Sequence, residues 1–140
     1  YIVYINNIYS IIQAERGTAM KISINADDLD QFKFFLNTLL LGGVTALLQK
    51  KANIDDIEYL MFGPKSIELL KLIPVESVYS DLIHQGTEIE DIASLLPGEL
   101  NNYLESLQEA ILHNYQSISL SKQNPVKITL FFDKTEYLVK

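Results

Sequence analysis

The densest run of apolar residues lies at residues 32–48 and predicts a buried central helix. Six of its residues and neighbours follow helical spacing: Leu29, Phe32, Leu36, Leu40, Leu47 and Leu48. Further apolar side chains fill the other sides, and a helix that is apolar nearly all round needs neighbours on several faces. We therefore expect a helix over about residues 26–50, capped by Asn25, with the rest of the chain packed around it.

This apolar run is too short to indicate a membrane span. Residues 34–48 carry no charge, but Asn37, Thr38 and Thr45 interrupt them, and a spanning helix needs about 20 apolar residues. The pattern favours a core helix in a protein that binds no membrane. Gly42 and Gly43 each cost up to about 1 kcal/mol relative to alanine in a helix interior, so they predict a kink or a close helix crossing.

Shorter helices are expected after the central one, separated by glycine, proline and capping signals. Their predicted ranges are 54–62, 65–72, 74–86 and 87–96. Gly86 is expected to end the third of these, and Thr87 with Glu90 to form a capping box at the start of the fourth. A last helix from Leu100 to about Tyr115 has an apolar face that should pack on the central helix.

Both chain ends show strand patterning. Residues 21–25 and 126–132 alternate apolar and polar side chains, and Asp133 with Lys134 is expected to turn the tail into a hairpin with residues 136–139. A lone hairpin is marginally stable, so the tail should pair with residues 21–25, with the opening residues or with another chain, which would make a homodimer. The predicted fold class is mainly α, a compact multi-helix domain around one buried central helix, with a minor β-strand pair or hairpin from the chain ends.

The segment before Met20 differs in character from the rest of the chain. It lacks capping signals, and residues 20–32 are typical of the start of a bacterial protein. We interpret residues 1–19 as an upstream extension, residues 20–120 as the helical domain, and residues 121–140 as a linker with a C-terminal strand tail.

The net charge of -7 is unevenly distributed. Between residues 72 and 121 there is no lysine or arginine, and the acidic residues there are Glu76, Asp81, Glu88, Glu90, Asp91, Glu99, Glu105 and Glu109. Such a field repels nucleic acid and attracts a basic protein. We take five of these as the candidate partner-binding surface, which we call the acidic face: Glu76, Asp81, Glu88, Glu90 and Asp91. The alternative is a helix surface that is charged only for solubility.

Little in the chain indicates catalysis. Cysteine is absent, which excludes disulfides and thiolate sites and favours a cytoplasmic protein. There is no H-E-x-x-H, P-loop, G-x-G-x-x-G or G-x-S-x-G motif, so we expect no catalytic residues, no cofactor and no metal. His84 and Thr87 form a candidate polar site, and a metal-dependent or hydrolytic enzyme using His84 with Glu88 or Asp91 is the alternative function. The simpler interpretation is that His84 interacts with carbonyl groups at a helix end.

Two stretches carry a family resemblance: IDDIEYLMFGPKSIELL at residues 54–70 and LIHQGTEIEDIASLLP at residues 82–97. They resemble a family of small bacterial proteins known as domain of unknown function family 3969, over residues 20 to about 118. The resemblance implies a bacterial source, a mainly helical domain and a natural start near Met20. It supplies no catalytic residue, cofactor or partner.

These observations predict a non-catalytic protein-binding or regulatory module, of which an immunity protein is one form. The expected partner is a basic protein that binds the acidic face.

Overall fold

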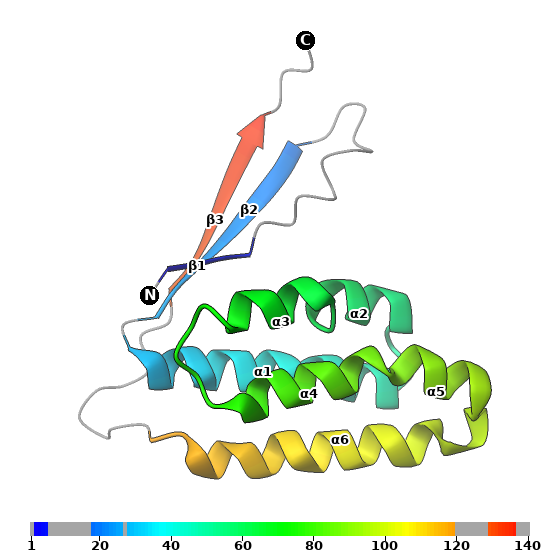
Figure 1. Cartoon of the computed structure of the whole chain (residues 1–140). Helices are drawn as coiled ribbons and strands as arrows, with labels where there is room; N and C mark the ends of the chain where they lie inside the picture. The colour runs from blue at the N-terminus through cyan, green and yellow to red at the C-terminus, as the bar shows by residue number, and fades with distance from the viewer. Residues whose placement is uncertain (1, 6–17, 27, 120–128, 137–140) are drawn as a thin grey trace. The chain divides into compact units, whose positions relative to one another are not determined.

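The computed structural model describes residues 2–5, 18–26, 28–119 and 129–136 (Figure 1). The chain divides into two compact units. Residues 33–119 form the helical unit, and residues 1–32 together with 120–140 form the sheet unit.

The chain is mainly helical, which confirms the predicted class. The helices are α1 (Leu29–Leu48), α2 (Ile54–Met61), α3 (Pro64–Leu70), α4 (Ser77–Thr87), α5 (Ile89–Leu95) and α6 (Leu100–Asn114), with short 3-10 turns η2 (Pro97–Glu99) and η3 (Tyr115–Ser117). In Figure 1, α5 continues on from α4, and α6 runs back beside both of them.

The core of the helical unit comes from α1, the α2–α3 pair, α4, the start of α5 and α6. Its most deeply buried apolar residues are Leu40, Val44, Phe62, Tyr79, Leu82, Ile83, Ile89, Leu104, Leu107 and Ile111. On α4 and α6 these residues recur every three or four positions, so one stripe of each helix is buried and the rest meets water. Helix α1 contributes its buried side to this core, and its opposite side bears the exposed Gly42.

Helix α6 and the η3 turn after it contact α1 through hydrogen bonds and one aromatic pair. Asn37 is fully buried, and its Nδ2 donates a hydrogen bond to the Ile111 carbonyl oxygen at 2.9 Å. Asn114 Nδ2 donates to Asn37 Oδ1 at 3.1 Å. The rings of Phe34 and Tyr115 meet edge to face with centroids 5.8 Å apart. Because a buried amide without partners costs about 1–3 kcal/mol, these bonds fix how the two helices are rotated against each other.

The start of α1 differs from the prediction. Asn25 does not cap it, because Asn25 is the last residue of a strand. Asp28 takes that role, since its Oδ1 accepts a hydrogen bond from the Gln31 backbone amide at 2.9 Å. The side chain directly before the helix reaches its free amides, whereas Asn25 is engaged in the sheet ladder.

The predicted capping between α4 and α5 is also wrong. Helix α4 runs through Gly86 to Thr87, and Glu88 is the N-cap of α5. The capping box does not form, because Thr87 Oγ1 donates to the His84 carbonyl oxygen at 2.6 Å. The Glu90 amide instead donates to Glu58 Oε1 on α2 at 3.2 Å. A contact distant in sequence therefore replaces the local cap.

The sheet unit contains three antiparallel strands in the order β1 (Ile2–Ile5), β2 (Thr18–Asn25), β3 (Thr129–Glu136). The central strand β2 pairs Asn25 with Ile2 on one side and with Thr129 on the other. The C-terminal hairpin is not supported, because β3 runs straight through the expected turn at Asp133 and Lys134. Residues 137–139, its second arm, lie outside the described residues.

Candidate functional site

The helical unit carries all of the net negative charge. It contains five lysines and twelve aspartates and glutamates, while the rest of the chain has equal numbers of each sign. Lys71 is the last cation before residue 119, so α4, α5 and α6 present only negative formal charge. The electrostatic field over these helices is therefore of a single sign.

Four members of the acidic face lie on α4 and α5 with exposed side chains. Asp81, His84 and Glu88 follow one another at helical spacing, so they share the outward side of α4 and its C-cap. Glu90 and Asp91 lie in the first turn of α5, where the helix dipole favours negative charge. The structure thus brings these four carboxylates onto two consecutive helices.

Glu76 differs from the other four because it is held in an ion pair. It is the N-cap residue of α4, and its Oε1 accepts a hydrogen bond from Lys33 Nζ at 2.7 Å. The Lys33 side chain is only 10% exposed, against 56% for Glu76. The bond to the Lys33 ammonium is the main reason that the pKa of Glu76 is lowered. Glu76 therefore links α1 to α4 through this ion pair.

Glu58 on α2 lies beside the acidic face and was not predicted as part of a site. Burial is the main cause that raises its pKa, and repulsion from Glu90, Asp55 and Asp91 adds to it, while the hydrogen bond from the Glu90 amide lowers it. Helix α2 and the start of α5 therefore place several carboxylates close together. Because Glu58 and Glu90 are 32 positions apart, only the general excess of acidic residues hinted at this in the sequence.

Tyr103 on α6 holds Glu88 in place. Its hydroxyl donates to the Gln85 carbonyl oxygen at 2.8 Å, and Glu88 Oε2 lies 3.2 Å from the same hydroxyl. Burial, followed by the nearby Glu88 charge, raises the pKa of Tyr103 to about 12. The tyrosine therefore stays protonated and links the end of α4 to α6.

The predicted polar site, His84 and Thr87, lies in the last turn of α4. The Thr87 hydroxyl is used in a bond to the His84 carbonyl within one helical turn. The His84 side chain is exposed in the last turn of α4. Within the described ranges, no group of three or more histidine, aspartate or glutamate side chains is arranged to hold a metal ion.

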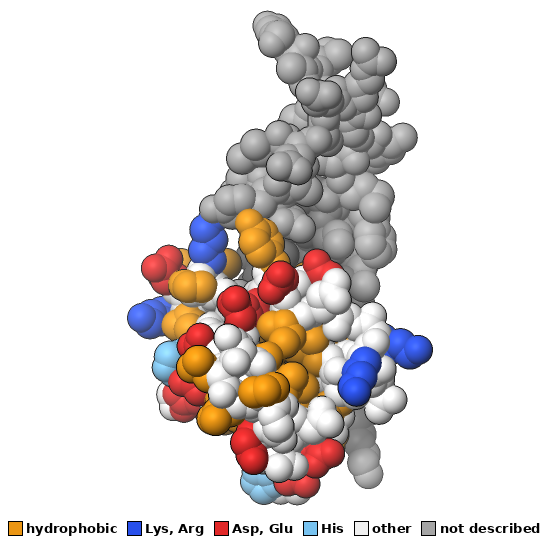
Figure 2. Space-filling model, turned by 90° about the vertical axis from the view of Figure 1, so that its right-hand side faces the viewer, with side chains coloured by type: hydrophobic (Ala, Val, Ile, Leu, Met, Phe, Trp, Pro, Cys, Tyr) orange, Lys and Arg blue, Asp and Glu red, His pale blue; other side chains and the backbone are white. Residues whose placement is uncertain are grey.

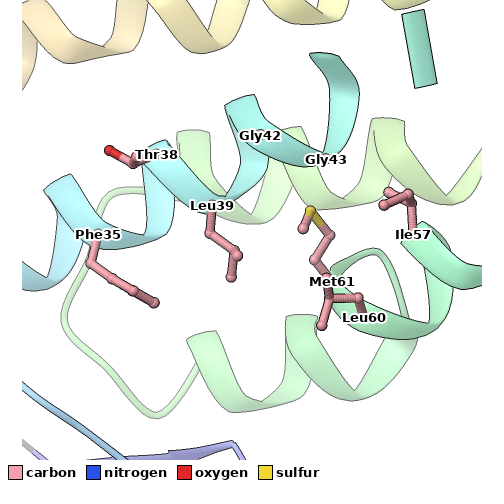
Figure 3. A pocket seen from close by; sticks show the side chains of 8 residues that line it. All are labelled: Phe35, Thr38, Leu39, Gly42, Gly43, Ile57, Leu60 and Met61. Carbon is pink, nitrogen blue, oxygen red and sulfur yellow. The ribbon is translucent and has the colours of Figure 1, made fainter. Parts of the chain in front are cut away.

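An apolar groove of about 420 Å³ runs between α1 and α2 (Figure 3). Phe35, Leu39, Leu60 and Met61 point into it, and an alanine Cβ at Gly43 would lie 2.6 Å from Met61 Sδ. At Gly43, side chains of α2 therefore lie close to the α1 backbone.

Gly42 lies in the wall of the same groove but has a different role. No atom lies within 4 Å of the position that an alanine Cβ would take there. Its lack of a side chain is therefore not required by packing within the helical unit.

Helix α1 is long and apolar enough to cross a membrane by length and composition alone. The same property is shared by core helices of soluble proteins. Less than half of the α1 window is buried, at 44%, and Leu40, Val44 and Leu47 in it contribute to the core.

A family model described as Protein of unknown function (DUF3969) matches residues 27–129. The matched region contains all of α1 to α6 and confirms the resemblance seen in the sequence. No curated protein and no solved structure matches the chain significantly.

Proposed function

The chain belongs to the DUF3969 family of proteins of unknown function, and we propose that it is a non-catalytic binding or regulatory module that receives a basic protein on its acidic face. An immunity protein, which neutralises a toxic basic partner, is one form of this function. Its expected place is the cytoplasm, given the absence of cysteine.

One observation carries the proposal: exposed carboxylates on α4 and α5 face no cation from their own helices or from α6. Asp81, Glu88, Glu90 and Asp91 are all exposed, and no lysine or arginine lies between residues 72 and 119. Repulsion from Glu90 and Asp91 contributes to the raised pKa of Glu58 on α2. A partner that supplies lysine or arginine would relieve this repulsion and would be steered towards the surface.

The proposal is tested with two charge-reversal variants of equal charge change. Asp81→Lys with Asp91→Lys reverses the acidic face, while Glu105→Lys with Glu109→Lys reverses two exposed carboxylates on α6. Tagged wild-type and variant chains are used to recover partners from cells of the source organism at low salt.

The expected result is a basic protein recovered by the wild type and by the α6 variant, and reduced at least about tenfold by the acidic-face variant. Raising the salt from about 0.05 to about 0.5 M should release it, because exposed charges are then screened within a few ångströms. Equal recovery by both variants, or no salt effect, would contradict the proposal.

A further inference from the structure

Two consecutive leucines at the end of α5 are unusually exposed. Leu95 is 74% exposed and Leu96, the C-cap residue, is 54% exposed. Complete burial of a leucine side chain contributes about 1.5–3 kcal/mol, so this pair forgoes much of that stabilisation in the isolated chain. Adjacent exposed apolar residues with a polar rim are typical of interaction sites.

Acidic residues surround these leucines. Asp91 lies four positions before Leu95 and therefore on the same face of α5. Glu88 is one turn earlier, and Glu99 is in η2 just after the leucines, both exposed. Figure 2 views the end of the helical unit that carries α5, and it shows hydrophobic side chains gathered in the middle, acidic side chains above and below them, and basic side chains at the two sides.

The negative charge of these surrounding residues indicates which kind of partner can bind here. A second copy of the chain would bring the same carboxylates against themselves, and phosphate groups of a nucleic acid or an anionic membrane would be repelled too. A basic amphipathic segment fits both parts of the surface. Its apolar side chains can cover the leucines while its lysines or arginines meet the carboxylates, as in interfaces with an apolar centre and a polar rim.

We propose that Leu95 and Leu96 are the apolar anchors of a docking surface for a basic amphipathic helix, with Glu88, Asp91 and Glu99 as its acidic rim. This inference rests on the proposed function and deepens it, because it names the part of the surface that supplies affinity and the chemistry of the segment that binds. Electrostatic attraction steers the partner, and the leucines slow its dissociation.

The test uses three synthetic peptides of about 18 residues that form one helix. The first has leucine on one face and lysine on the other, the second has glutamate in place of lysine, and the third has serine in place of leucine. Binding to the whole chain is measured by fluorescence anisotropy. The variant Leu95→Ser with Leu96→Ser is compared with Leu112→Ser, which changes an exposed leucine on α6, and circular dichroism checks that each variant is folded.

The leucine–lysine peptide should bind the wild type and the Leu112 variant equally, and bind the Leu95 and Leu96 variant at least about tenfold more weakly. The glutamate and serine peptides should bind at least about tenfold more weakly than the first. If the serine peptide binds as well as the first, and the leucine substitutions have no effect, Leu95 and Leu96 are not anchors, but binding of basic segments to the acidic face is still supported. If neither peptide that contains lysine binds, the proposed docking surface is refuted. Whether the acidic face binds a protein is then tested separately by the recovery of partners from cells.

Sedimentation velocity on the chain alone tests the remaining alternative, in which a second copy of the chain covers the leucines. A wild-type dimer that becomes a monomer in the Leu95 and Leu96 variant would assign these leucines to a second copy and overturn the proposal. A monomer in both cases supports it.

Discussion

Alanine substitutions at Gly86 and Gly42 should have opposite effects on stability, although both glycines lie within helices. A Cβ at Gly86 would overlap the Phe62 ring, while a Cβ at Gly42 would meet nothing within 4 Å. Phe62 is only 2% exposed, so its ring is part of the core and cannot turn into solvent to make room. Overpacking of a core costs about 1–3 kcal/mol, whereas alanine is favoured over glycine in a helix interior by about 1 kcal/mol.

These terms set the expected magnitudes. Gly42→Ala should raise the free energy of unfolding by about 1 kcal/mol. Gly86→Ala gains less from helix propensity because it lies in the last turn of α4, and should lower the free energy by about 2 kcal/mol. Gly43→Ala should fall between them, because the atom 2.6 Å away is the sulfur of the flexible Met61 side chain.

Urea unfolding followed by circular dichroism at 222 nm measures all three variants. With an m-value of about 1.5 kcal/mol per molar urea, the midpoint should rise by about 0.7 M for Gly42→Ala and fall by about 1.3 M for Gly86→Ala. The double variant Gly86→Ala with Phe62→Leu is the control, and it should be more stable than the sum of the two single effects predicts. A Gly86 variant as stable as the wild type, or a less stable Gly42 variant, would refute this packing argument.

Three further substitutions test the electrostatics and the end of α1. Glu76→Gln should lower stability at neutral pH by at most about 1 kcal/mol, since Glu76 is half exposed. Its folded-state pKa is lowered, so urea titrations at several pH values should show this loss disappearing as acid protonates Glu76 in the folded state. Glu58→Gln should raise stability at pH 7 and lose the advantage in acid, because the pKa of Glu58 is raised in the folded state and an amide oxygen can still accept the Glu90 hydrogen bond. Lys50 has a φ of 53°, so Lys50→Gly should raise the thermal unfolding midpoint by removing about 1 kcal/mol of left-handed strain; an unchanged midpoint would contradict this.

Features that depend on local periodicity could be predicted from the sequence. The predicted ranges of α2 and α6 agree with the structure to within about a residue, because apolar spacing and the Gly63–Pro64 break are local signals. The role of Gly86 was mispredicted for a physical reason. In the sequence, Gly86 resembles a helix C-cap, and only the position of the Phe62 ring shows that the glycine is needed for packing.

The candidate site could also be predicted only in part. The excess of acidic residues was visible in the sequence, as were all five members of the acidic face. The hydrogen bonds that hold some of these carboxylates could not be predicted, because the Lys33 to Glu76 bond spans 43 positions and the Glu58 to Glu90 bond spans 32. Long-range contacts of this kind decide which carboxylates are engaged within the chain.

The bond between Asn37 and the Ile111 carbonyl, 74 positions apart, has a consequence for biosynthesis. A ribosome adds about 5–20 residues per second, so α1 is synthesised roughly 3–13 seconds before α6 is complete and able to cover it. During this interval the side of α1 that α6 covers stays exposed to water, and the Asn37 amide lacks the partners that α6 supplies. Nascent α1 is therefore the segment on which a chaperone should act, and chains that stop before α6 should be the ones that aggregate.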